Sequence, residues 1–268
     1  MKKTELKYYD LGTDVVAFST TRQGGYGTGN YAEFNITHYC GDDQETVKQN
    51  RAALCQLLNI KDEMLILPRQ THQTEICNID EDFFALSETD RLRMLEGVDA
   101  VMTNLTGVCI GVSTADCIPI LLYDPIHRIA AAVHAGWRGT VARIVEKTIR
   151  TMSDNYGSKP YDMVAQIGPG ISLDSFEVGD EVYDAFQQAA FDMALISKRF
   201  LVPDSSTLTS KWHIDLPKCN RLQLLSCGIP SEHIATSPFC TYQNPETFFS
   251  ARRLGIHSGR IFTGILLL

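Results

Sequence analysis

The strongest pattern of hydrophobic positions lies between residues 108 and 150. Two apolar runs, VCIGVSTADCIPILLY and RIAAAVHA, are rich in Val, Ile and Ala and are separated by a turn at residues 124–126. Apolar runs bounded by turn residues are typical of buried strands. The second run ends at His134, and the small-residue turn AGWRG leads to Thr140, which is suited to the N-cap of a helix. The pattern predicts two adjacent strands and a helix, with Cys117 inside the first strand and His134 where the second strand meets the helix.

Apolar positions three or four residues apart predict the helices. One helix starts at a capping box formed by Asp42 and Glu45 and ends near Asn59. Two more are predicted over 180–196 and 215–227, and residues 80–96 are predicted to form a loop or a short helix. The helix after Thr140 has a predicted apolar face made of Val141, Ile144, Val145, Ile149 and Met152. The helix over 215–227 has Leu222 and Leu225 on its predicted inner face.

Shorter apolar or alternating segments predict the remaining strands. They cover residues 14–20, 64–67, 74–79, 99–103 and 163–167, together with the apolar run at the C-terminus. Residues 201–213 are polar and are predicted to be a loop. Because strands and helices interleave and no repeat or linker interrupts them, we expect residues 1–268 to form a single α/β domain.

Composition and charge narrow the class of protein. The chain has 44% hydrophobic and 21% charged residues, which is ordinary for a globular protein of 268 residues. Its formal net charge of −8 argues against a nonspecific nucleic-acid surface. No apolar run reaches the length that a membrane span requires. We therefore expect neither nucleic acid nor a membrane as a partner. The expected assembly is a monomer or a small homo-oligomer.

The cysteines and the N-terminus indicate a cellular compartment. The segment MKKTELKYYDLG lacks the apolar core of a secretory signal. The eight cysteines include no C-x-x-C pair, and a disulfide framework is not expected in a chain of this length without a signal. We predict a cytoplasmic protein in which most cysteines act as small core hydrophobes.

Four arginines are candidates for binding an anion. Arg138 lies in the turn at the predicted helix start, where Gly136 and Gly139 allow a ligand to approach the backbone. Arg22 lies in the Gly-rich segment TRQGGYGTGN, which matches neither a Walker nor a Rossmann fingerprint. Arg252 and Arg253 lie near the C-terminal strand of an acidic chain. Arg138 is the first candidate for a phosphate group, and the other three are further candidates.

His72, Cys117 and His134 are residues of the types that bind zinc. Two histidines and one cysteine would leave one tetrahedral position for water or substrate, as catalytic zinc sites do. The 17 residues from Cys117 to His134 match no short zinc motif. Spacing alone therefore favours a core cysteine and two unrelated histidines.

The motifs themselves carry a resemblance. In chain order they are TTRQGG, RQTHQ, TADCIPILLYD, AAVHAGWRGT, IGPGIS with FEVGDEV, and CTYQNPETFFSARR. With these motifs the sequence resembles the family called laccase-domain, multicopper polyphenol oxidase or peptidoglycan-editing-factor proteins. The resemblance covers nearly the whole chain, and HAGWRGT together with ADC is highly specific.

The resemblance implies a fold, a metal site and an activity. The implied fold is a four-layer α/β/β/α sandwich with mixed sheets. The implied metal ligands, also the implied catalytic residues, are His72, Cys117 and His134 around a zinc ion. The implied activity is phosphorolysis of adenosine, inosine, guanosine and methylthioadenosine, together with deamination of adenosine. Purine nucleosides and phosphate are then the expected partners.

The names attached to this family imply different activities, and the spacing of the histidines distinguishes between them. A laccase needs a trinuclear copper cluster built from H-x-H pairs, whereas no two of the seven histidines here are two residues apart. Zinc is redox-inert, so one zinc ion gives hydrolytic or group-transfer chemistry. Copper could enter the same site under copper excess and give weak phenol oxidation.

Each expected reaction assigns a role to the site. For deamination, zinc would activate a water molecule to attack C6 of adenine. For phosphorolysis, phosphate held by Arg138 would attack C1′ of the ribose. Asp116 adjoins Cys117 but is expected to support the metal ligands or the structure rather than to act as the general acid, since neighbouring strand residues point to opposite faces. No residue is assigned as the general acid.

Two alternatives use the same residues. One is a cysteine hydrolase that edits peptidoglycan precursors, with Cys117 as the nucleophile and His134 as its base. The other is a binding or scaffold protein whose zinc is structural. A zinc-bound thiolate is a poor free nucleophile, so metal content distinguishes the hydrolase from the zinc enzyme.

Overall fold

Two β-sheets packed face to face form the centre of the molecule. The computed structural model describes residues 4–203 and 208–268. The five-stranded sheet contains, in spatial order, β1 (Leu6–Tyr9), β2 (Val15–Thr20), β14 (Ile261–Leu267), β6 (Cys109–Thr114) and β3 (Leu65–Ile66). The six-stranded sheet contains, in spatial order, β13 (Ile234–Thr236), β9 (Val164–Ile167), β7 (Ile118–Asp124), β8 (Ile129–Ala135), β5 (Val98–Thr103) and β4 (Glu75–Ile79).

Both sheets are mixed. In the five-stranded sheet β3 runs parallel to β6, while β14 is antiparallel to both β2 and β6. In the six-stranded sheet β4 is parallel to β5 and β13 is parallel to β9, whereas β7, β8 and β5 are joined by antiparallel pairs. The predicted strands are present except that the first central apolar run is divided between β6 and β7, and β1 and β13 are further strands of these sheets that were not predicted.

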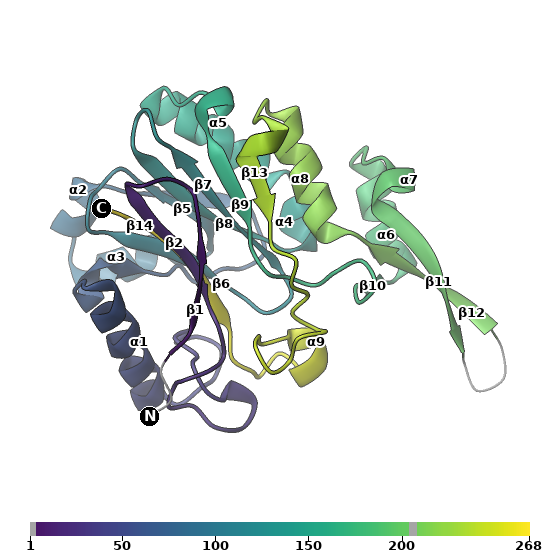
Figure 1. The fold of residues 1–268 in the computed structure, drawn as a ribbon, viewed down its shortest axis with the longest axis horizontal. Coiled ribbons are helices and arrows are strands. Elements are labelled where there is room, and N and C mark those ends of the chain that lie inside the picture. Colours follow the sequence, from purple (N-terminus) through teal and green to yellow (C-terminus); the bar gives the residue numbers. More distant parts are fainter. Residues whose placement is uncertain (1–3, 204–207) are drawn as a thin grey trace.

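Nine α-helices are found in the described residues (Figure 1). Their bounds are α1 Gln44–Leu58, α2 Glu81–Ala85, α3 Glu88–Met94, α4 Trp137–Val141, α5 Ile144–Tyr156, α6 Asp180–Gln188, α7 Met193–Ile196, α8 Leu216–Ser226 and α9 Ala251–Leu254. Short 3-10 turns lie at Gly29–Tyr31, Asp62–Met64, Pro160–Asp162 and Ser231–His233. None of the described helices is long and apolar enough to cross a membrane.

Three apolar clusters define four layers. Between the sheets, Ile110 and Ile265 of the five-stranded sheet pack with Leu121 and Ala132 of the six-stranded sheet. On the outer face of the five-stranded sheet, Leu54 of α1 packs in a second apolar cluster, separate from the one between the sheets. On the outer face of the six-stranded sheet, side chains of α5 and α8 pack on β7, β8 and β9. The predicted α/β/β/α order of layers is therefore confirmed.

The predicted faces of the helices are largely correct. Ile144, Val145, Ile149 and Met152 of α5 are buried as expected. In α8 the buried face instead contains Cys219 and Leu224, while Leu222 and Leu225 are only half-buried. Helix α8 therefore faces the sheet with a side rotated away from the predicted one.

Three predicted helix boundaries are wrong, each for a local reason. Helix α1 is capped by Asp43, whose carboxylate accepts from the Thr46 N–H, while Asp42 accepts instead from the Asn35 side chain. Thr140 lies inside α4, whose N-cap is Gly136. The helix predicted over 180–196 is broken at Ala190, which adopts a left-handed φ of 59°, into α6 and α7.

Residues 201–203 and 208–213, predicted as part of a loop, belong instead to a third sheet, while residues 204–207 of that prediction lie outside the described residues. Strands β11 (Ser197–Pro203) and β12 (Leu208–Ile214) form an antiparallel hairpin, and β12 also pairs with β10 (Glu177–Val178). This arm extends beyond the two main sheets (Figure 1). Its exposed polar residues, such as Arg199 and Lys211, hid the strand pattern.

The first apolar run of the central stretch is not one strand. Residues 115–117 separate β6 from β7, and these two strands belong to different sheets. Cys117 therefore lies in the connection through which the chain passes from one sheet to the other, not within a strand as predicted. His72 lies in a similar connection, because β3 and β4 also belong to different sheets.

Candidate metal centre

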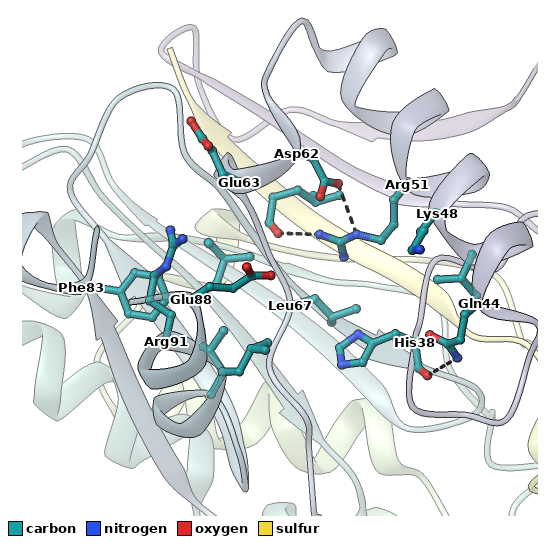
Figure 2. A pocket seen from close by; sticks show the side chains of 15 residues that line it. His38, Gln44, Lys48, Arg51, Asp62, Glu63, Leu67, Phe83, Glu88 and Arg91 are labelled. Atoms are coloured by element: carbon teal, nitrogen blue, oxygen red, sulfur yellow. Dashed lines mark hydrogen bonds and ion pairs between the residues drawn. The ribbon is translucent and has the colours of Figure 1, made fainter. Parts of the chain in front are cut away.

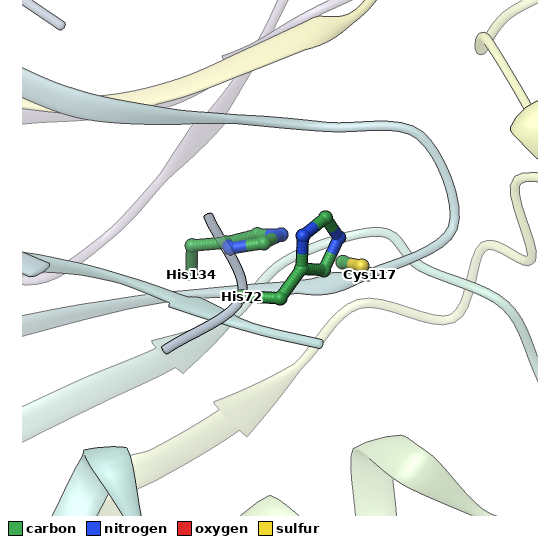
Figure 3. A group of neighbouring side chains, drawn as sticks. All are labelled: His72, Cys117 and His134. Atoms are coloured by element: carbon green, nitrogen blue, oxygen red, sulfur yellow. The ribbon is translucent and has the colours of Figure 1, made fainter. Parts of the chain in front are cut away.

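His72, Cys117 and His134 converge at one end of the two-sheet core (Figure 3). One ligand atom from each of these side chains lies within 4.8 Å of the others. The two imidazole rings meet edge to face, with centroids 4.9 Å apart. His134 is buried, Cys117 is half-buried and His72 is exposed. The cluster is thus closed on the side of the core and open on the side of His72.

Sheet register brings Cys117 to His134. In the ladder between β7 and β8, Pro119 lies opposite His134. Cys117 precedes Pro119 by two residues and stands at the same edge of the sheet. The β5–β8 ladder ends at the pair Ala100–Val133, so Asp99 adjoins His134 on the other side.

Asp99, a residue not predicted from the sequence to belong to the site, organises the cluster. Its carboxylate is fully buried and lies 2.7 Å from Nδ1 of His134. It also accepts hydrogen bonds from the backbone N–H groups of Thr71, His72 and Gln73, at 3.1, 3.0 and 2.8 Å. These bonds hold His72 in a left-handed conformation with a φ of 64°. One carboxylate therefore fixes two of the three candidate ligands.

Electrostatics in the cluster favour the charged forms. Burial alone would raise the pKa of Asp99, but the hydrogen bond and the charge of His134, together with the backbone N–H groups of Gln73 and Thr71, lower it overall. Burial would also raise the pKa of Cys117, yet the neighbouring His134 and His72 lower it overall. The pKa of His134 is raised, because Cys117 and Asp99 outweigh the effect of burial. The thiol of Cys117 is thus prepared to act as a thiolate, the form that binds metals.

The donor set fits a metal ion. An ionised Asp99 can only accept, so Nδ1 of His134 keeps its proton, and Nε2 is the ligand atom once metal binding has released the proton there. Gly136 keeps the space between the ligands free, because a Cβ there would lie 3.0 Å from Sγ of Cys117 and 3.0 Å from Cδ2 of His72. Two imidazoles and a thiolate suit a borderline-soft divalent cation.

A cavity of about 500 Å³ lies beside the exposed ligand. It is lined by Thr71, His72, Gln73, Thr74, Arg138 and Ala142. The Arg138 guanidinium lies over the Trp137 ring, 4.3 Å from its centroid. The structure therefore brings Arg138 close to the three candidate metal ligands, although α4 has only five residues and offers little helix dipole.

The other three candidate arginines lie elsewhere and donate to backbone carbonyls. Arg22 donates to Ala32 and Pro245, at 2.7 and 2.8 Å. Arg252 donates to the carbonyl of Glu177, and Arg253 donates twice to that of Tyr242. None of the three lines the cavity beside His72.

Asp116 has the structural role expected of it. It accepts from the Thr241 hydroxyl at 2.7 Å, the Ser250 hydroxyl at 3.0 Å and the backbone N–H of Arg252 at 2.7 Å. These bonds tie the segment before Cys117 to the C-terminal part of the chain and hold Asp116 at a φ of 91°.

Fold and site together define an α/β two-sheet protein with one cluster of two histidines and a cysteine that can hold a metal. A family model described as multi-copper polyphenol oxidoreductase laccase matches residues 16–268, and the chain belongs to this family. The resemblance found in the motifs is thereby confirmed. Within the described residues, however, His72, Cys117 and His134 make up the one group of three or more candidate ligands.

Relatives of known name span almost the full chain. A protein of Bacteroides thetaiotaomicron named purine nucleoside phosphorylase is 48% identical over 267 residues, covering 99% of this chain and 97% of the relative. A protein of an unknown prokaryotic organism named adenosine deaminase RL5 is 45% identical over 251 residues, covering 94% and 93%. The crystal structure of YlmD from Geobacillus stearothermophilus superposes with a TM-score of 0.83 at 30% identity, covering 95% of this chain and 92% of that one. These relatives place the chain among enzymes.

Proposed function

We propose that the protein is a zinc-dependent purine nucleoside enzyme. In this proposal it cleaves adenosine, inosine, guanosine and methylthioadenosine with phosphate and also deaminates adenosine. One observation supports this proposal. The cluster of His72, Cys117 and His134 opens beside a cavity that is lined by the positively charged side chain of Arg138. The names of the relatives, a purine nucleoside phosphorylase and an adenosine deaminase, support the same two reactions.

The ligands proposed for zinc are His72, Cys117 and His134. Bound there, zinc would act as a Lewis acid toward water or a substrate oxygen. The protein's own contribution is orientation, because Asp99 fixes both the ring of His134 and the backbone of His72 before substrate arrives. Such preorganisation lowers the cost of reaching the reactive geometry.

Arg138 is the residue we propose for phosphate. A guanidinium offers a planar fork of donors that matches phosphate oxygens. Its stacking on Trp137 limits the freedom of the side chain, so less entropy is lost when phosphate binds. Arg22, Arg252 and Arg253 already donate to carbonyl oxygens, which favours Arg138 over them.

A cysteine hydrolase is the second candidate, and one observation favours it. The lowered pKa of Cys117 beside the raised pKa of His134 is also the arrangement of an activated cysteine nucleophile. The two candidates differ in their dependence on metal: removal of zinc should abolish nucleoside turnover in the first and leave amide hydrolysis intact or enhanced in the second.

A copper-dependent phenol oxidase is disfavoured as the main activity. Reduction of oxygen by a laccase needs several coppers, whereas the described residues bring together one group of three ligands. With zinc bound and no added copper, we expect phenol oxidation near background, and weak oxidation only when copper replaces zinc.

A cytoplasmic location forms part of the proposal. All eight cysteines are free thiols, as a reducing compartment would keep them.

The test combines metal analysis with product analysis. Protein purified without added metal should contain about one zinc per chain, and Cys117→Ala should lose most of it while remaining folded. With adenosine and phosphate, the wild type should release adenine and ribose 1-phosphate, and without phosphate it should form some inosine. Metal-replete protein that leaves adenosine, inosine and methylthioadenosine unchanged but hydrolyses an amide in a cell-wall precursor would replace this proposal with the cysteine hydrolase.

A further inference from the structure

A second basic residue, Lys147, contacts the wall of the cavity beside His72. This lysine is exposed and belongs to the first turn of α5. Its Nζ donates to Oγ1 of Thr74 at 2.9 Å, and Thr74 is one of the residues that line the cavity. Arg138 lines the same cavity from α4. Two cations from two helices are therefore associated with one cavity, one of them through a threonine hydroxyl.

Neither of these cations is neutralised by a carboxylate. Among the described residues, the Arg138 side chain forms no hydrogen bond or ion pair, and the Lys147 ammonium forms only its bond to Thr74. No acidic residue is among the six described residues that line the cavity. The acidic neighbours in sequence are engaged elsewhere, since Glu75 lines a different cavity and Glu146 is ion-paired at 3.1 Å with the N-cap residue of α5.

The larger cavity between α1 and α3, of about 620 Å³, differs in this respect (Figure 2). The basic residues of its α1 wall already have partners. Lys48 is ion-paired with Glu45 at 2.7 Å, and Arg51 is paired with Asp62 at 3.3 Å and donates to the carbonyl of Leu65 at 3.1 Å. An anion would gain less at that wall, because existing acceptors would have to be displaced.

The bond from Lys147 leaves the Thr74 hydroxyl free to act as a donor. A hydroxyl has one proton to donate and two lone pairs with which to accept, whereas an ammonium group can only donate. Because Oγ1 of Thr74 accepts from Lys147, its proton is available to another group, and no acceptor for it is found among the described residues. Donation to an anion is strengthened by the positive charge on the other side of the oxygen.

We infer that Thr74 and Lys147 form the second half of the phosphate site that begins at Arg138. The Thr74 hydroxyl donates to one phosphate oxygen, Arg138 donates to others, and Lys147 is a positioning residue that holds and polarises the hydroxyl. Phosphate carries on average more than one negative charge at neutral pH, so two cations suit it better than one. The inference rests on the function proposed above, in which phosphate is the co-substrate.

Titration calorimetry with inorganic phosphate tests this inference without relying on turnover. We expect the wild type to bind phosphate with a dissociation constant of about 1 mM or below. Thr74→Val keeps the shape but removes the hydroxyl, and it should weaken binding about three- to tenfold, as should Lys147→Met. Thr74→Ser and Lys147→Arg keep the donors and should bind phosphate within about twofold of wild type.

The double variant distinguishes an indirect role of Lys147 from an independent one. If Lys147 acts through Thr74, the combination of Thr74→Val and Lys147→Met should bind phosphate about as weakly as the weaker single variant, because coupled residues are not additive. Lys159→Met and Thr236→Val remove an exposed lysine and an exposed threonine elsewhere and should bind phosphate as the wild type does. In turnover assays the KM for phosphate should rise in Thr74→Val and in Lys147→Met, while kcat changes less.

The outcomes separate this inference from the proposed function. Phosphate affinities of Thr74→Val and Lys147→Met equal to those of the controls, or additive losses in the double variant, would overturn the inference, while adenosine turnover by the wild type would leave the proposed function standing. Failure of the wild type to bind phosphate, or loss of phosphate binding only together with bound metal, would also overturn it. Weakened phosphate binding in both variants of a protein that converts no nucleoside would retain the phosphate site and overturn the nucleoside function.

Discussion

The carboxylate of Asp99 lies 2.7 Å from Nδ1 of His134 and also accepts the backbone N–H of His72. A buried carboxylate that holds a ligand imidazole fixes the orientation of the ring and increases its basicity. Here the same carboxylate also shapes the loop that carries a second ligand. The affinity of the site for metal should therefore depend strongly on a residue that does not contact the metal.

Asp99→Asn tests this dependence. We expect metal affinity to fall 10- to 100-fold, because an amide cannot accept four N–H groups as a carboxylate does. Competition with a coloured chelator measures the change. Asp124→Asn is a matched control, since Asp124 is also fully buried and accepts from His127 Nδ1 at 2.8 Å, but at the other end of β7 and β8. Equal metal affinity in Asp99→Asn and wild type would contradict the role of Asp99.

Gly136→Ala should damage the site without unfolding the protein. The added Cβ would lie 3.0 Å from both Cys117 Sγ and His72 Cδ2, so at least one ligand must move. We expect metal affinity to fall on the order of tenfold or more. Gly139→Ala, in the same short helix, meets its nearest atom at 3.3 Å and should change metal affinity much less. Thermal unfolding of both variants, measured without metal, checks that any loss is local to the site.

Arg138→Ala should separate the two proposed reactions. A charge-assisted bidentate contact contributes roughly 1.5–3 kcal/mol, so the KM for phosphate should rise on the order of tenfold or more. Deamination of adenosine, which needs no phosphate, should change less. Arg150→Ala removes an exposed arginine from α5 and is the control. If both reactions fall equally in Arg138→Ala, then Arg138 holds the nucleoside or the fold and not phosphate.

Asp124 should give the protein a stability that depends on pH. Burial would raise its pKa, but hydrogen bonds from the His127 ring and from the N–H groups of Ile126 and His127 lower it overall. A carboxyl with a depressed folded-state pKa contributes stability above its unfolded pKa of about 3.9, and this stability is lost as pH falls through the folded pKa.

Asp124→Asn should therefore lower the free energy of unfolding by about 1–3 kcal/mol at pH 7, and the difference from wild type should shrink below about pH 4. Urea unfolding at several pH values measures it. A difference that is the same at pH 7 and at pH 3 would show that the charge of Asp124 does not contribute.

The sequence predicts the buried elements of this fold better than the exposed ones. The apolar strands and the buried residues of α5, such as Ile149, are predicted correctly because their spacing reflects a packed core. The β11–β12 arm is missed because it projects from that core and because polar residues such as Lys198, Arg199 and Lys211 interrupt the apolar positions of its strands. The break between α6 and α7 is missed because Ala190, rather than glycine, adopts the left-handed conformation there.

The candidate site, like the fold, is predicted only in part from the sequence. Its three ligands are identified by resemblance, since their spacing alone favours unrelated residues. Cys117 is assigned to a strand because the apolar run continues on both sides of it, and only the sheet topology shows that the run belongs to two sheets. Asp99 could have been noticed, because a charged residue within the apolar segment VDAVMT must find a partner when buried. The partner itself depends on the pairing of β5 with β8, which the pattern does not specify.

The three candidate ligands are all positioned by neighbouring strands of the six-stranded sheet, and this has a consequence for the order of folding. Cys117 precedes β7, His134 lies in β8, and His72 precedes β4 and is held by Asp99 of β5, so the site forms only after these four strands have paired. Metal would then bind late, after the folding transition state. Added zinc should slow unfolding and leave the refolding rate nearly unchanged, since interactions absent from the transition state act on the unfolding rate alone. The metal would act as a kinetic lock on a structure that has already assembled.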